Sequence, residues 1–303
     1  MNPESTYAEC LRASEKIHWR VEDLIGGDKQ LDFSRPFLPE GLARTQELTF
    51  LSPRERLVLN QIRGHEYLTM FGLVEEFILP FVMDHARRDL DGDDHRTRAF
   101  LTFAEEEAKH IHLFKEFRRA FQAGFRGQCD VIGPPQAVAK EVLSHPPLAV
   151  ALVILHIEWM TQRHFQESVR DDADLDPCFK SLLRHHWMEE AQHAKLDAKM
   201  VEELAASMSA DEIRAGLDGY AKIGAFLDDG LMQQVELNLR ALERVLGAPL
   251  GLDEQTQYRE VQRRALRWTY LGSGMTHPRF LETLQTLEPR ARADVESMAP
   301  AFS

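Results

Sequence analysis

The sequence predicts an all-α protein built around a four-helix bundle, with further helices before and after it. Apolar residues recur with the helical period in long segments, and alternating Val/Ile/Thr runs bounded by Asn-Gly or Asp-Gly turns are not seen. Four of these segments follow one another between about residues 52 and 207, separated by short breaks rich in Pro, Gly or Asp. We therefore expect these four segments to form the bundle.

Two helices are expected in the first third of the chain. An N-terminal helix is predicted over roughly residues 4–24, packed outside the bundle. The first bundle helix should begin after Ser52, an N-cap residue followed by Pro53 in the first turn and by Glu55 at the capping-box position. It should run to about Leu90 and kink at Pro80, because proline removes a backbone hydrogen bond and crowds the preceding turn.

The breaks in the sequence delimit the remaining helices. The second bundle helix is predicted over residues 93–122, and a loop at 124–135 should join the two helix pairs. The third follows the His-Pro-Pro stretch at 145–147 and should continue to about residue 170, and the fourth spans about 177–207. Beyond the bundle, helices are expected near 210–228, 229–246 and 253–270, with a shorter one around 278–288. The whole chain, 1–303, should form a single domain with its core at about 52–207.

Composition excludes several classes of protein. The chain has a formal net charge of −13, with acidic residues spread along its length, which argues against nucleic acid as a partner. The three cysteines (Cys10, Cys129 and Cys178) form no Cys-x-x-Cys pair and no even-numbered disulfide framework. No signal peptide and no apolar stretch long enough to span a bilayer is evident. We therefore expect a soluble cytoplasmic protein.

Two copies of the motif Glu-x-x-His are the residues that most directly predict a function. Glu107–His110 and Glu190–His193 lie 83 residues apart, each in a predicted bundle helix. Residues i and i+3 share a helix face, so each motif can present a carboxylate and an imidazole to one metal centre. Two such helices, with one glutamate from each of two others, are the ligand pattern of a two-metal carboxylate site. On its helix, the first motif lies on an apolar stripe, whereas its neighbours Glu105, Glu106 and Lys109 fall off the stripe and should be solvated.

The second motif has a third candidate ligand. His186 precedes Glu190 by four residues and lies in the same narrow arc of the helix as Glu190 and His193. Glu189 and His185 form a competing pair at i and i+4, which we rank lower because neither belongs to a Glu-x-x-His motif.

The other two helices each offer a buried glutamate. Glu158 is flanked by apolar residues on its own face and precedes Glu190 by 32 residues. In the first bundle helix either Glu75 or Glu76 is the candidate. Glu75 is the only carboxylate in an apolar sector of that helix, whereas Glu76 stands 31 residues before Glu107 and is followed by an aromatic residue, as Glu158 is. We keep both and prefer Glu76, because Pro80 can shift the helical phase.

Mixed carboxylate and imidazole ligands favour iron, with manganese as the alternative, and no nearby cysteine supports a thiolate zinc or iron–sulfur site. The pattern Glu, Glu-x-x-His, Glu and His-x-x-x-Glu-x-x-His resembles the ferritin-like di-iron oxygenases. Through its extra histidine, it resembles specifically the p-aminobenzoate N-oxygenase family, which oxidises arylamines to nitro compounds. The resemblance covers roughly residues 52–207. It implies seven ligands to two iron ions, listed in chain order: Glu76 or Glu75, Glu107, His110, Glu158, His186, Glu190 and His193.

The resemblance implies an O2-dependent oxygenase that transfers oxygen to an arylamine-like nitrogen through a peroxo species on the two irons. No flavin or nicotinamide fingerprint occurs, so the electrons should come from an external donor. Alternatives are hydroxylation or desaturation of an aliphatic substrate, or a non-catalytic iron-binding bundle. The first bundle helix is apolar on all sides, which favours a homodimer. The segment Trp268–His277 is interpreted as a helix end packed on the bundle rather than a cap over a pocket.

Overall fold

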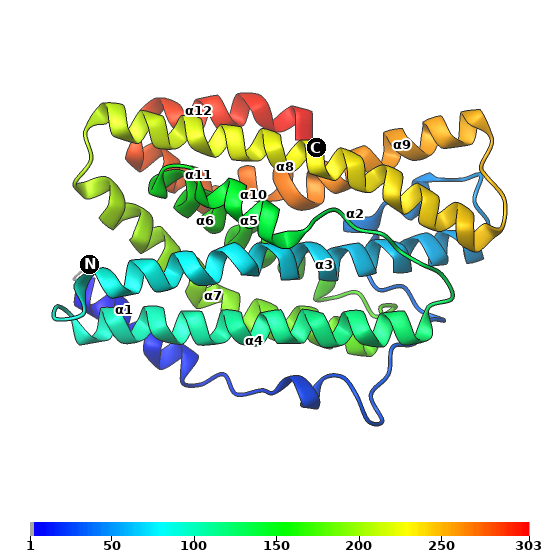
Figure 1. Cartoon of the computed structure of the whole chain (residues 1–303), viewed down its shortest axis with the longest axis horizontal. Helices are drawn as coiled ribbons and strands as arrows, with labels where there is room; N and C mark the ends of the chain where they lie inside the picture. Colours follow the sequence, from blue (N-terminus) through cyan, green and yellow to red (C-terminus); the bar gives the residue numbers. More distant parts are fainter. Residues whose placement is uncertain (1–2, 303) are drawn as a thin grey trace.

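The computed structural model describes residues 3–302 and contains helices but no strand within that range; an isolated bridge joins Gly26 and Lys29. Four long helices form the bundle: α3 (Pro53–Ala86), α4 (Asp94–Gly124), α6 (Pro147–Arg163) and α7 (Pro177–Ala206). α3 packs along α4, and α6 packs along α7 (Figure 1). The predicted all-α class is thereby confirmed, and all four predicted bundle helices are present.

Local signals explain where α3 begins. Ser52 accepts a hydrogen bond from the Glu55 backbone N–H, and the Glu55 carboxylate accepts one from the Ser52 N–H at 2.7 Å. The helix continues through Pro80 and ends at Ala86, followed by a 3₁₀ turn, so it is a few residues shorter than predicted. Its apolar circumference is covered within the chain, because α4, α5 (Pro135–Leu143) and α8 (Ala210–Leu246) all pack on it.

The third bundle helix changes its winding near its end. α6 is α-helical to Arg163 and continues as a π-helical turn, His164–Val169. The predicted helix to residue 170 therefore has the right length but two kinds of turn. π-helical turns occur often at functional sites.

The prediction of two helices over 210–246 was wrong: α8 is a single helix of 37 residues. A capping box formed by Ser209 and Glu212 begins it, and Gly247 ends it in the left-handed conformation, with φ at 76°. The interior of α8 contains Gly224 and Gly230. A helical glycine costs only about 1 kcal/mol relative to alanine, however, and packing of α8 on α3, α6 and α9 exceeds that cost.

Close packing of α6 against α8 needs two other glycines. A Cβ on Gly216 would lie 2.7 Å from Leu148 Cδ2, and a Cβ on Gly219 would lie 2.7 Å from the Cβ of Ala149. Real Cβ atoms do not approach so closely, so the two helices pack at this distance because both positions lack a side chain. This contact holds α6, which carries Glu158, against the C-terminal half of the chain.

The remaining elements surround the bundle. α1 spans Pro3–Ser14 and packs on α4 and α7, outside the bundle as predicted but ending ten residues earlier. The structure adds α5 and a C-terminal α12, neither of which was predicted. The short and C-terminal elements are the 3₁₀ turns Val21–Asp23, Thr45–Glu47, Arg87–Asp89 and Ala299–Phe302, the π turn Trp268–Gly272, and helices α2 (Glu40–Ala43), α9 (Leu252–Arg267), α10 (Ser273–Met275), α11 (Pro278–Leu287) and α12 (Pro289–Met298).

One polar network joins α1, α3, α4 and α7 at an end of the bundle. The Glu203 carboxylate accepts hydrogen bonds from Tyr7, from His85 Nε2 at 3.2 Å and from Arg96 Nε at 3.2 Å. Burial raises the pKa of Glu203, but these hydrogen bonds and the Arg96 charge bring it down to about 2. The ionised carboxylate therefore stabilises the fold at neutral pH.

Candidate metal centre

The four bundle helices bring seven of the predicted residues together in the interior. α4 contributes Glu107 and His110, and α7 contributes His186, Glu190 and His193. α3 contributes Glu75, and α6 contributes Glu158. Each of the seven side chains is at most 2 % exposed. Burial of so many ionisable groups in one place is costly unless they are paired or bind a cation.

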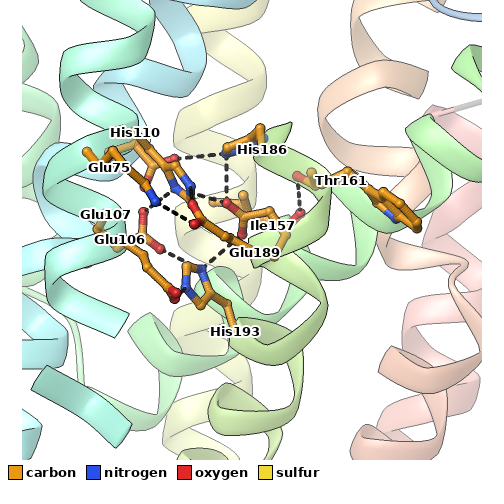
Figure 2. A network of polar contacts seen from close by, with 12 residues as sticks. Glu75, Glu106, Glu107, His110, Ile157, Thr161, His186, Glu189 and His193 are labelled. Atoms are coloured by element: carbon orange, nitrogen blue, oxygen red, sulfur yellow. Dashed lines mark hydrogen bonds and ion pairs between the residues drawn. The ribbon is translucent and has the colours of Figure 1, made fainter. Parts of the chain in front are cut away.

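Their donor atoms form two adjoining groups (Figure 2). Glu75, His110, His186 and Glu190 make one group, and Glu107, His110, Glu190 and His193 make the other. Within each group the candidate ligand atoms all lie within 4.8 Å of one another. The groups share His110 and Glu190, so they adjoin, and each could hold a metal ion.

Glu158 lies beside these groups rather than inside either one. Its carboxyl group hydrogen-bonds with Glu190, and its Oε2 has no hydrogen-bond partner. Burial and repulsion by Glu190 raise the pKa of Glu158 well above its ordinary value.

In α3 the structure brings Glu75, and not Glu76, to the centre. Glu75 Oε1 lies 3.4 Å from His186 Nε2, and Glu75 also hydrogen-bonds with Glu107. Glu76 is half-buried on another face of the helix, where its carboxylate accepts a hydrogen bond from Gln136 at 3.4 Å. The preference for Glu76 rested on sequence spacing and a possible phase shift at Pro80. Pro80 lies one turn beyond both glutamates, and the apolar sector of the helix contains Glu75, the residue that lies beside His186.

Two further glutamates, which the sequence analysis placed on the surface or ranked low, hold the histidines. Glu106 is buried and accepts a hydrogen bond from His193 Nε2 at 2.7 Å, and Glu189 accepts one from His110 Nε2 at 2.9 Å (Figure 2). Each of these two hydrogen bonds thus links α4 to α7. The prediction that Glu106 and Lys109 are fully solvated was wrong, since Lys109 donates to Glu189. In both copies of the Glu-x-x-His motif a second glutamate directly precedes the motif glutamate, and this was the feature of the sequence that could have indicated these contacts.

These cross-helix bonds fix the orientation of both imidazoles. With Nε2–H donating to a carboxylate, Nδ1 of each ring faces the cluster. His110 Nδ1 lies 3.1 Å from Glu190, and His193 Nδ1 lies 3.0 Å from Glu107. A metal-ligating histidine usually donates its other N–H to a carboxylate or carbonyl in this way, which sets its tautomer and raises its basicity.

The electrostatics of the cluster favour positive charge among its carboxylates. Burial lowers the pKa of His110 and His193, but the surrounding carboxylates raise both well above the ordinary value. Burial and repulsion by Glu107 raise the pKa of Glu75. The Glu190 pKa, despite burial, lies well below its usual value because histidines face it and Glu158 donates a hydrogen bond to it. Without a cation, the cluster must take up protons to balance its carboxylates.

The residues present fit two divalent metal ions. Glu75, Glu107, Glu158 and Glu190 carry a formal charge of −4 when ionised, which two divalent cations would cancel. Glu75 Oε2 and Glu158 Oε2 are buried without a hydrogen-bond partner, whereas Glu107 and Glu190 face His193 Nδ1 at 3.0 and 3.3 Å. Buried unsatisfied atoms are rare in folded proteins, and a bound metal ion would satisfy them.

Asp197, one turn beyond His193 on α7, is a buried carboxyl group that the sequence analysis did not single out. Both of its oxygens are buried without a hydrogen-bond partner. Burial raises its pKa well above the ordinary value, as do the charges of Glu107 and Glu190. It lies on the stripe of α7 that carries the motif, at i+4 from His193, which was the signal available in the sequence.

An apolar cavity of about 460 Å³ adjoins the cluster. Its wall includes Phe71 from α3, whose ring packs edge-on against the His186 ring at 5.3 Å, and Ile157, which directly precedes Glu158. α5, α8 and the π turn at 268–272 close the other sides. Tyr270 and Leu271 of that turn line the cavity, so the segment interpreted as a plain helix end forms part of a pocket wall. The volume suits an organic small molecule.

Comparison with known proteins identifies related sequences and folds. The profile of the family described as "P-aminobenzoate N-oxygenase AurF" matches residues 2–265. No curated protein matches the chain significantly. Among the helices of residues 3–302, none has the length and apolar character needed to cross a bilayer.

Solved structures share the architecture at low sequence identity. An R2-like ligand-binding oxidase with an aerobically reconstituted Mn/Fe cofactor superposes with a TM-score of 0.50 and 15 % identity, covering 88 % of this chain and 92 % of that chain. A variant with an anaerobically reconstituted Mn/Fe cofactor gives a TM-score of 0.50 and 14 % identity, with coverages of 89 % and 93 %. These similarities show a common fold.

Proposed function

Because this chain belongs to the p-aminobenzoate N-oxygenase family, we propose that it is an O2-dependent enzyme that oxygenates the nitrogen of an amine substrate. Membership confirms the predicted enzyme class, a non-haem di-iron oxidoreductase, and the predicted two-metal cofactor fits the buried donor set. One observation carries the proposal furthest: two adjoining groups of buried ligand atoms lie close to an apolar cavity of substrate size, whose wall includes Phe71, in contact with His186, and Ile157, next to Glu158.

We propose Glu75, Glu107, His110, Glu158, His186, Glu190 and His193 as the ligands of two iron ions, with manganese as the alternative at one position. When bound, the two metals supply the site at which O2 is held and reduced. Glu76, which is turned toward Gln136, is left outside this set.

The chain's own residues contribute orientation and a dry environment. Glu106 and Glu189 hold His193 and His110 so that their Nδ1 atoms face the metals. Phe71 stands between the cavity and His186, so the substrate side of the centre is apolar and excludes water. An amine placed in the cavity would lie next to the ligand-bearing turns of α3 and α6, which is the positioning that transfer of an oxygen atom requires.

The atoms and electrons of the overall reaction balance when an external donor supplies two electrons. One oxygen atom of O2 forms an N–O bond with the amine, giving a hydroxylamine. The other atom leaves as water, which consumes two electrons and two protons. Since no flavin or nicotinamide motif occurs in the sequence, we propose that a separate reductase or small reductant supplies the electrons. A cytoplasmic location and a homodimer stay predictions; sedimentation at working concentration would test the dimer.

The apolar lining of the cavity also suits a second reaction on the same centre. Few polar groups contact a ligand there, so an aliphatic chain could be hydroxylated or desaturated instead. Product analysis separates the two reactions, because N-oxygenation gives a hydroxylamine or nitro compound, whereas C–H oxidation gives an alcohol or an alkene.

The test loads the protein with Fe(II) under argon, adds ¹⁸O2 with a reductant and a panel of arylamines, and analyses products by mass spectrometry. We expect ¹⁸O bound to nitrogen in at least one product. The His193→Ala variant should give none, because it removes a proposed ligand of one of the two metal positions. Oxygen inserted only into carbon, or equal product from wild type and variant, would contradict N-oxygenation at this site.

A further inference from the structure

The cavity beside the metal centre extends further than a single aromatic ring needs. A second cavity of about 180 Å³ adjoins it and shares four wall residues with it, Ile157, Leu227, Tyr270 and Leu271. The second cavity is lined mainly by apolar side chains of α6, α8 and the C-terminal segment. Together they form an extended apolar space, and the wall of its larger part includes Phe71, which contacts His186, and Ile157, which directly precedes Glu158.

The charges along this space are all of one sign. No Lys, Arg or His lines the main cavity among residues 3–302, whereas two carboxylates, Glu141 from α5 and Asp229 from α8, do. Both carboxylates are exposed, so they stand where the cavity meets solvent. Glu141 has a histidine at 3.8 Å, and no ion pair of Asp229 is found among the described residues. Tyr270 and Gln233 add polar groups without charge.

This charge pattern conflicts with an aminobenzoate as substrate. If the amine nitrogen points toward the metal centre, the para carboxylate points toward the mouth. There it would gain no cationic partner from the cavity wall, and it would face two like charges. A neutral substituent avoids both costs, and a cationic substituent would be attracted by Glu141 and Asp229.

We propose that the main cavity selects amines whose far end is neutral or positively charged, and that Glu141 and Asp229 exclude carboxylate-bearing amines. This inference rests on the proposed function only in placing an amine in the cavity. The chain would then differ in substrate charge from the compound for which its family is described.

Binding of three compounds of similar shape tests the selection. p-Aminobenzoate is anionic at neutral pH, p-aminobenzamide is neutral, and 4-(aminomethyl)aniline is cationic. Their dissociation constants are measured by calorimetry on Fe(II)-loaded protein under argon, so that no turnover is needed. We expect the neutral compound to bind at least about tenfold more tightly than the anion, and the cation to bind at least as tightly as the neutral compound.

Variants at the mouth test the cause. The double variant Glu141→Gln/Asp229→Asn should reduce the difference between anion and neutral compound by about three- to tenfold, as expected for two partly screened charges. Asp218→Asn is the matched control, because Asp218 is an exposed carboxylate on the same helix that does not line the cavity, and it should change nothing.

The inference is overturned if p-aminobenzoate binds as tightly as the neutral amide, if the double variant leaves the difference unchanged, or if none of the three compounds binds. Its failure is distinguishable from that of the proposed function. If the compounds bind in the predicted order but no N-oxygenated product forms, the proposed reaction is refuted and the proposed selection by charge is supported. If p-aminobenzoate binds best and is N-oxygenated, the proposed selection is refuted and the proposed reaction is supported.

Discussion

Removing the charge of Glu106 should weaken metal binding although Glu106 is not proposed as a ligand. Its carboxylate accepts a 2.7 Å hydrogen bond from His193 Nε2 in a fully buried environment. Hydrogen bonds to charged groups contribute roughly 1.5–3 kcal/mol, and loss of such a partner typically lowers metal affinity about 10- to 100-fold. Glutamine keeps an acceptor oxygen but no charge, so the metal affinity of Glu106→Gln should fall about tenfold. Leucine keeps neither, so the metal affinity of Glu106→Leu should fall about 100-fold.

The assay is competition for Fe(II) with a chromogenic chelator under argon, with circular dichroism to verify helicity. Glu105→Gln is the control, because Glu105 is the adjacent residue and is exposed. Its affinity should equal that of the wild type. If Glu106→Gln and Glu106→Leu also bind iron like the wild type, the hydrogen bond to His193 does not support the metal centre and the reasoning is refuted.

Two further predictions concern stability. Gly219→Ala should lower the free energy of unfolding by about 1–3 kcal/mol, because the new methyl group meets the Ala149 Cβ. Gly224→Ala on the same helix places its methyl group where no atom lies within 4 Å, so it should raise the free energy of unfolding by up to about 1 kcal/mol. Equal changes in the two variants, measured by urea unfolding, would contradict this packing. The Glu203 pKa, at about 2, lies below its unfolded value, so its ionised form stabilises the fold above pH 4.5 and this stability is lost as pH falls toward 2. Glu203→Gln should therefore be less stable than wild type by roughly 1–3 kcal/mol at pH 7, and the difference should shrink below about pH 4.5; a difference that is independent of pH would exclude the ionised carboxylate as its source.

The sequence carried enough information for the bundle and most of the centre because both follow from local patterns. Capping residues placed the start of α3, and the i, i+3 spacing placed each glutamate and histidine on one face. α8 was wrongly predicted as two helices, because the tertiary packing on α3, α6 and α9 that stabilises one long helix is not visible in the sequence.

The choice between Glu75 and Glu76 shows a different limit. Two adjacent residues point about 100° apart on a helix, so the helical phase decides which one faces the centre. The number of residues between a glutamate and a motif on another helix does not tell which side of its own helix the glutamate faces. The apolar sector around Glu75 does tell this, because that sector faces the interior. The roles of Glu106 and Glu189 depend on how closely α4 approaches α7, and no local pattern in either helix specifies that distance.

The most direct test of the metal centre is the metal content of the chain and of two neighbouring variants. Protein is reconstituted anaerobically with Fe(II), desalted, and analysed for iron, manganese and zinc by plasma mass spectrometry. We predict about two irons per chain for the wild type and for Glu76→Ala, and a loss of at least one for Glu75→Ala with helicity unchanged. One metal or none in the wild type, or full occupancy in Glu75→Ala with loss in Glu76→Ala, would contradict the centre described here.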